Sequence, residues 1–152
     1  MAPAPNRFHQ EISRNLQFEL HSYLKRNPIG KIFNAPFDVY LDEINVFHPD
    51  ILIVLNERLG ILTEEGAEGA PDLVVEILSP KTRGLDLVNK KLEYARAGVK
   101  ELWIIDPEPR SLTIHELISD GVEKIRQLGE EDNLSTDLLP GFNVAVETIF
   151  ER

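Results

Sequence analysis

Two carboxylates beside apolar runs are the residues whose type and spacing could support chemistry. Glu76 stands in residues 73–78, where the other five residues are aliphatic. An ionised carboxylate there is costly unless it is paired, bound to a metal or placed at the open end of a strand. Asp50 directly precedes a second apolar run, residues 51–55. If the two runs pair as antiparallel strands, the carboxylates lie about 4.5–5.5 Å apart.

Two adjacent carboxylates suit one hard divalent cation. Proteins usually hold Mg²⁺ through one or two carboxylates, while waters and a substrate phosphate complete its shell. We therefore predict that Asp50, Glu76 and the carbonyl of Ile77 bind Mg²⁺ or Mn²⁺, and that the cation activates water for attack on phosphorus. Asp72 is about 13 Å from Glu76 along an extended strand, too far to share the cation, and is predicted to begin the strand. The alternative is that Glu76 pairs with a basic residue or faces solvent at a sheet edge.

A basic segment follows Glu76 and offers a positive group for a phosphorus-centred reaction. Residues 77–100 contain six basic and two acidic residues, a local net charge of +4. Asp86, Lys90 and Tyr94 are four residues apart and share one face of a predicted helix. By spacing alone, a surface ion pair between Asp86 and Lys90 is the simpler interpretation, and Lys91 lies nearer to the predicted apolar stripe.

The remaining pattern predicts the elements that position these residues. Residues 7–25 carry an amphipathic helical stripe with Asn6 as N-cap, and His9 falls on the inward face. Residues 33–41 are predicted as a bent or paired half-buried strand interrupted near Pro36, and residues 56–70 as a polar loop.

The second half of the sequence predicts a crossover and a hairpin. Strands at 73–78 and 102–105 flank a helix and should be parallel and joined right-handedly. Gly98 suits the C-terminal cap of that helix. The apolar stripe predicted for the helix consists of Leu85, Val88, Leu92 and Ala95. A hairpin at 112–117 and 122–128 and a short element at 144–150 complete an α/β protein with one mixed sheet flanked by helices.

Length and composition restrict the class of protein. The 152 residues suit a single domain, 1–152, and no stretch approaches the length of a membrane helix. The absence of cysteine excludes disulfides and is compatible with a cytoplasmic protein. A net charge of −10 argues against general attraction to DNA phosphates. We therefore expect metal-free DNA binding to be weak and salt-sensitive, with productive contacts limited to the basic segment.

Several of these segments resemble the Uma-type family of putative restriction endonucleases, within the PD-(D/E)XK nuclease superfamily. The resemblance covers nearly the whole chain and is carried by His9-Gln10, Pro49-Asp50, residues 70–80, Asp86 with Lys90 and Tyr94, and residues 97–107. It implies a restriction-endonuclease-like core, metal-dependent cleavage of DNA, and Asp50 and Glu76 as metal ligands. It also implies that Lys90 replaces the lysine that the superfamily motif has two residues after the glutamate, where this chain has Leu78.

The resemblance leads to a specific site and to competing functions. Asp50, Glu76 and Lys90 are the expected catalytic residues, and His9, Ser79, Asp86 and Tyr94 are expected to support them. The chain begins after the acidic segment that usually opens the family's sequences, so an extra acidic ligand and an edge strand would be missing. The competing interpretations are a weakly active or inactive nuclease-fold module that binds nucleic acid or a protein, and a purely structural subunit. Cutting two strands favours a homodimer.

Overall fold

The computed structural model describes residues 6–79, 85–118 and 121–152, and side chains throughout these ranges except at positions 85, 86 and 123. Two basic residues of the predicted segment, Lys81 and Arg83, therefore lie outside the described residues, as does the side chain of Asp86.

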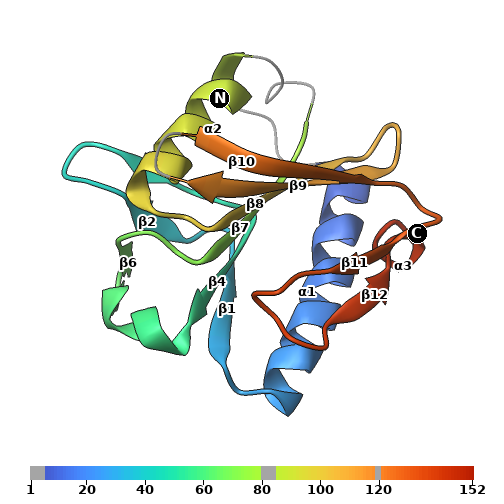
Figure 1. The fold of residues 1–152 in the computed structure, drawn as a ribbon, viewed down its shortest axis with the longest axis horizontal. Coiled ribbons are helices and arrows are strands. Elements are labelled where there is room, and N and C mark those ends of the chain that lie inside the picture. Colours follow the sequence, from blue (N-terminus) through green and yellow to red (C-terminus); the bar gives the residue numbers. More distant parts are fainter. Residues whose placement is uncertain (1–5, 80–84, 119–120) are drawn as a thin grey trace.

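A mixed six-stranded sheet forms the centre of the molecule (Figure 1), in the order β1-β4-β7-β8-β9-β10. β7 and β8 are parallel, and the other neighbours are antiparallel. The predicted crossover and hairpin are therefore present. The strands are β1 (Gly30–Asn34), β4 (Ile51–Leu55), β7 (Leu73–Ile77), β8 (Glu101–Asp106), β9 (Ser111–Ile118) and β10 (Gly121–Leu128).

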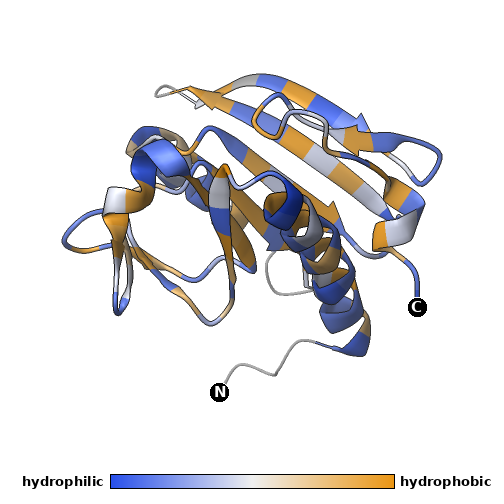
Figure 2. Cartoon of the chain, turned by 90° about the horizontal axis from the view of Figure 1, so that it is seen from below, coloured by the Kyte–Doolittle hydropathy of each residue, from blue (hydrophilic) through white to orange (hydrophobic). Residues whose placement is uncertain are grey.

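Two helices cover opposite faces of this sheet. α1 (Arg7–Arg26) packs on the face that carries Ile53, Val75 and Trp103, and α2 (Leu85–Ala97) packs on the face that carries Val74 and Leu102. Figure 2 shows hydrophobic residues concentrated in the central strands and hydrophilic residues concentrated in the turns. The sheet therefore lies between two apolar layers, as expected for an α/β protein.

A small second sheet corrects the prediction of a loop at residues 56–70. Its order is β3-β2-β6-β5, with β2 (Asp38–Tyr40), β3 (Val46–Phe47), β5 (Leu62–Thr63) and β6 (Gly66–Glu68), and the 3₁₀ helix η1 (Asn56–Ile61) leads into it. Gly66 has φ 152°, and a Cβ there would lie 2.1 Å from the carbonyl oxygen of Asp38. Only glycine permits this parallel pairing of β6 with β2.

The predicted strand at 33–41 is two strands in different sheets, with a cis peptide bond at Ala35–Pro36 between them. The chain ends with a two-stranded hairpin, β11 (Asn133–Ser135) and β12 (Asn143–Ala145), followed by α3 (Val146–Ile149). The first strand of this hairpin was not predicted. Asn15 Nδ2 of α1 donates to the carbonyl of Ile149 at 3.0 Å, which fastens the terminal element to α1.

Candidate active site

The antiparallel pairing of β4 with β7 brings Asp50 beside Glu76. Ile51 lies opposite Val75, and the Asp50 N–H donates to the Val75 carbonyl at 3.1 Å. Because the strands are antiparallel, the next pair after Ile51 and Val75 is Asp50 opposite Glu76. The Ile77 N–H donates to Asp50 Oδ2 at 2.7 Å, so the backbone of β7 itself orients this carboxylate.

Glu76 is a nearly buried carboxylate with two partners on α2. Its exposed fraction is 7%, and Oε2 accepts a 2.7 Å hydrogen bond from the Tyr94 hydroxyl. Lys90 Nζ lies 3.4 Å from Oε1. Burial raises the pKa of Glu76 above its ordinary value, and the charge of Asp50 adds to this effect, whereas Lys90 and Tyr94 oppose it. Among the described residues, the site therefore confines two carboxylates with the cationic side chain of Lys90 beside them.

α2 presents Lys90, and not Lys91, to the carboxylates. Tyr94 is fully buried and stands four residues after Lys90, so both side chains reach the end of β7. Lys91 instead acts on His115 of β9, whose pKa is lowered by burial and, to a smaller extent, by the charge of Lys91. The predicted stripe is wrong at two positions because Val88 and Leu92 are exposed. This shift of the packed face explains why Lys90 turns inward.

His9 joins the site from α1. Its Nε2 lies 3.5 Å from Asp50 Oδ1, and the Asn6 Oδ1 accepts from the His9 N–H at 2.8 Å, which confirms the predicted N-cap. The hydrogen bond to Asp50 raises the pKa of His9, despite burial, and the Ile77 carbonyl contributes in the same direction. His9 thus lies against Asp50, one of the groups predicted to bind the cation.

Two further residues complete the surroundings. Ser79 is half-buried and lies two residues beyond the end of β7. The Phe47 ring packs against Tyr94 with 5.2 Å between centroids. Phe47 was not predicted to belong to the site. Its position three residues before Asp50 could have indicated that it lies nearby.

The donor set fits a hard divalent cation. Among the described residues, Asp50 Oδ1 and Glu76 Oε1 have the longer contacts, 3.5 and 3.4 Å, while the other oxygen of each carboxylate accepts a 2.7 Å hydrogen bond. A divalent cation between these two oriented carboxylates would offset their mutual repulsion more fully than Lys90 does. Within the described residues, no group of three or more His, Asp or Glu side chains is arranged to hold a metal, so the Ile77 carbonyl is the additional donor to consider.

Most described cations of the predicted basic segment do not face this site. Lys100 Nζ lies 2.8 Å from Oδ1 of the buried Asp72, at the opposite end of β7, and Arg96 pairs with Glu93 on the surface. Asp72 also accepts the Leu55 N–H at 2.7 Å through Oδ2. Its predicted place at the start of the strand is therefore confirmed, and its role is to join β4 and β7.

The mixed sheet between two helices defines a restriction-endonuclease-like α/β protein. The chain belongs to the Uma2 family, described as "Putative restriction endonuclease", whose model matches residues 1–147. A crystal structure of a putative nuclease belonging to DUF820 from Anabaena variabilis has the same fold, with a TM-score of 0.80 and 18% identity over 97% of this chain and 83% of that chain. No curated protein matches the sequence. No helix of the described residues is long and apolar enough to span a membrane.

Proposed function

We propose that this protein is a metal-dependent nuclease that hydrolyses phosphodiester bonds of DNA. The observation that carries the proposal is the convergence of Asp50, Glu76 and Lys90 at the adjoining ends of β4 and β7. Membership of a family of putative restriction endonucleases supports the same reaction class. Mg²⁺ or Mn²⁺ would be held by Asp50, Glu76 and the Ile77 carbonyl, and would supply a more acidic water and charge neutralisation at phosphorus.

The side chains of this chain have separable tasks in the proposed reaction. Hydrolysis joins the water oxygen to phosphorus and breaks a phosphorus–oxygen ester bond, while negative charge grows on the phosphoryl oxygens. Lys90 places a positive charge where that charge develops. Tyr94 fixes one oxygen of Glu76, and the Ile77 N–H fixes one oxygen of Asp50, so each carboxylate presents its other oxygen to the site. His9 restrains that second oxygen of Asp50.

Cleavage of DNA by wild type and by Glu76→Gln tests the proposal. We expect wild type to nick supercoiled plasmid in Mg²⁺ or Mn²⁺ and Glu76→Gln to leave it intact, because the amide cannot supply a charged ligand. Glu93→Gln is the matched control, since Glu93 lies on the exposed part of the same helix and should retain activity. Intact linear, supercoiled and single-stranded DNA after incubation of wild type with either metal would exclude the proposed reaction.

The competing function is a nuclease-fold module without catalysis. The described residues place only two carboxylates at the site and no group of three or more potential metal ligands. A site with so few charged ligands favours the module without catalysis as the second candidate. Calorimetry separates the two functions, because a nuclease should bind Mg²⁺ or Mn²⁺ saturably and Asp50→Asn should abolish that binding. A module without catalysis should show no such dependence on Asp50.

The proposed substrate also bears on assembly. Cutting both strands of a duplex requires two such sites, so we propose a homodimer. Light scattering of the purified protein tests this, and a monomer of 17.3 kDa at all accessible concentrations would contradict it.

A further inference from the structure

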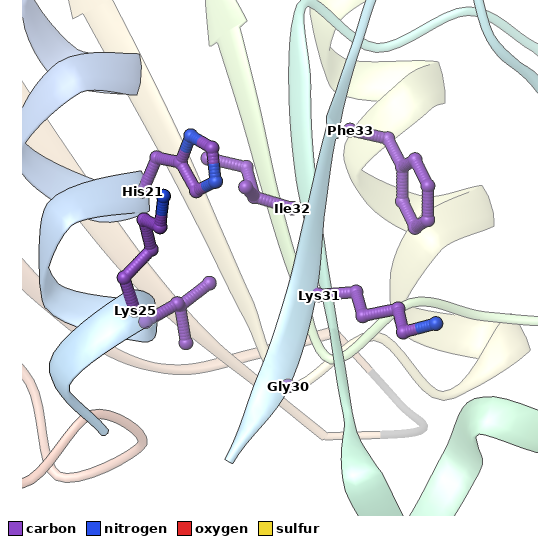
Figure 3. A pocket seen from close by; sticks show the side chains of 7 residues that line it. His21, Lys25, Gly30, Lys31, Ile32 and Phe33 are labelled. Atoms are coloured by element: carbon purple, nitrogen blue, oxygen red, sulfur yellow. The ribbon is translucent and has the colours of Figure 1, made fainter. Parts of the chain in front are cut away.

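A groove runs between α1 and the edge strand β1. It consists of two adjoining depressions of about 230 and 310 Å³ that share His21 and Ile32 as lining residues. In Figure 3, His21 and Lys25 extend from α1 and Ile32 extends from β1 into the space between them. Lys31 and Phe33 leave β1 on its other side. The two depressions therefore form one surface channel with a polar wall on the helix and an apolar floor.

The groove begins beside the candidate active site. α1 carries His9 near its first turn, and His9 contacts Asp50. β1 ends at Asn34, which lines the groove, and the N–H of the next residue, Ala35, donates to the Asp50 carbonyl at 3.0 Å. The two elements that hold Asp50 therefore continue as the two walls of the groove. From Arg14 to Lys25 the helix wall is about 16 Å long.

The groove is basic although the protein carries a net charge of −10. Arg14 and Lys25 line it from α1, and no described Asp or Glu side chain lines either depression. Across the described ranges neither of these two cations forms an ion pair, in contrast to Lys90, Arg96 and Lys100. Glu19 lies about 140° around the helix from Arg14, on the other flank of α1. Lys25 is thus available to an anionic ligand, and so is Arg14, whose charge also acts on Glu11 one helical turn away, where Arg7 is the main cause of the lowered pKa of Glu11.

An exposed aromatic side chain stands among these cations. Phe18 is 67% exposed and lines the groove four residues after Arg14 and three before His21. Gln17 and Asn34 add hydrogen-bonding groups beside it. Cations along a channel with an exposed aromatic ring are the pattern that binds single-stranded nucleic acid, because phosphates contact the cations and an unpaired base stacks on the ring.

We propose that this groove binds a single strand of nucleic acid, with Arg14 and Lys25 contacting phosphates and Phe18 stacking on a base. The proposal rests on the nuclease function, to which it adds the path by which substrate leaves the candidate active site. The occupant of the groove itself is an unpaired strand rather than a duplex, because stacking on Phe18 needs an unpaired base. An acidic peptide that extends the sheet at the edge strand β1 is the competing occupant.

Fluorescence anisotropy with a labelled oligodeoxythymidylate of about 20 nucleotides tests the proposal without requiring cleavage. Binding is measured in EDTA over a salt series. The double variant Arg14→Gln/Lys25→Gln should bind about tenfold more weakly and flatten the slope of log K against log salt by about 1.4, because two phosphate contacts are lost. Phe18→Ala should weaken binding at least about fivefold. The matched control is Lys124→Gln/Arg96→Gln, which removes the same charge from exposed positions elsewhere and should bind like wild type.

The outcomes separate this inference from the proposed function. Glu76→Gln should lose cleavage and keep oligonucleotide binding. If wild type cleaves DNA but the groove variants bind like wild type, or lose no more affinity than the control, the groove is not the path. If a duplex binds as tightly as the oligonucleotide and Phe18→Ala has no effect on either, a single strand is excluded as the occupant of the groove. Binding of a labelled glutamate-rich peptide, and not of the oligonucleotide, assigns the groove to an acidic peptide instead.

Discussion

The Tyr94 hydroxyl donates a 2.7 Å hydrogen bond to Glu76 Oε2, inside a packed layer between α2 and the central sheet. Burial, aided by the charge of Glu76, raises the pKa of Tyr94, so this hydroxyl keeps its proton and remains a donor. The same hydrogen bond opposes the effect of burial on the pKa of Glu76. The pair therefore allows a charged carboxylate to exist in an apolar layer and fixes its direction.

Removing only the hydroxyl of Tyr94 should destabilise the fold. We expect Tyr94→Phe to lower the free energy of unfolding by about 1–3 kcal/mol, because a buried carboxylate oxygen loses its partner. The ring contact with Phe47 can persist in this variant. Urea unfolding at neutral pH measures the change. Tyr40→Phe is the matched control, since its hydroxyl meets the more exposed Asp38 at 3.2 Å and should contribute within about 0.5 kcal/mol. Equal stability of wild type and Tyr94→Phe would contradict the role assigned to the hydrogen bond.

The two neighbouring lysines of α2 should differ sharply in cleavage. Lys90→Met is expected to lower the cleavage rate about 100-fold or more, because it removes the cationic group beside Glu76. Lys91→Met should retain cleavage, since Lys91 lies near His115 on another strand. Single-turnover plasmid nicking at saturating Mg²⁺ measures both rates, and circular dichroism confirms that both variants are folded. A reversed order of the two rates would assign the positive group to Lys91.

The sequence was sufficient to predict the two carboxylates of the site, but not to predict which face of α2 packs against the sheet. An acid within an aliphatic run, Glu76, and an acid at the start of another run, Asp50, are local signals, and antiparallel pairing brings them together. The prediction that Val88 and Leu92 belong to the buried face of α2 was wrong, because these apolar residues are exposed while Tyr94 is buried. A tyrosine is buried here because its hydroxyl meets Glu76, a tertiary contact that periodicity cannot predict.

The small second sheet was missed for a different physical reason. β5 and β6 have only two and three residues, too few to show an alternating pattern. Gly66 normally indicates a turn, yet here its missing side chain permits the close approach of β6 to Asp38. The α1–β1 groove was missed because one wall is a helix and the other is an edge strand, and only the fold brings these two elements together.

The ion pair between Lys100 and Asp72 should stabilise the fold more than a surface pair does. Lys100→Met is expected to lower the free energy of unfolding by about 1–3 kcal/mol, because the buried Asp72 carboxylate loses a charged partner at 2.8 Å. Lys100 is 49% exposed, so water replaces part of the interaction and the loss stays below that of a fully buried pair. Arg96→Met, which removes the exposed pair with Glu93, should cost about 0–1 kcal/mol. Equal losses in urea unfolding would show that burial of Asp72 adds nothing.

The stability of the protein should depend on pH through His115. Burial lowers the pKa of this histidine, and the charge of Lys91 lowers it further, while its contact with the Leu102 carbonyl opposes both effects. The unfolded chain therefore binds a proton near the ordinary value of about 6.5, at which the folded chain does not. The contribution of His115 is fully present above that pH and is lost as pH falls from there through the lowered pKa of the folded state.

Two variants isolate this contribution from other titrating groups. The free energy of unfolding of wild type and His115→Gln, measured in urea from about pH 5 to pH 8, should differ by an amount that changes across this window. The wild-type curve should fall more steeply towards acid, because only wild type carries the histidine that resists protonation when folded. Lys91→Met should reduce the steepness, since removing a nearby positive charge raises the pKa of His115. Parallel curves for wild type and His115→Gln would show that the histidine accepts its proton equally well in both states.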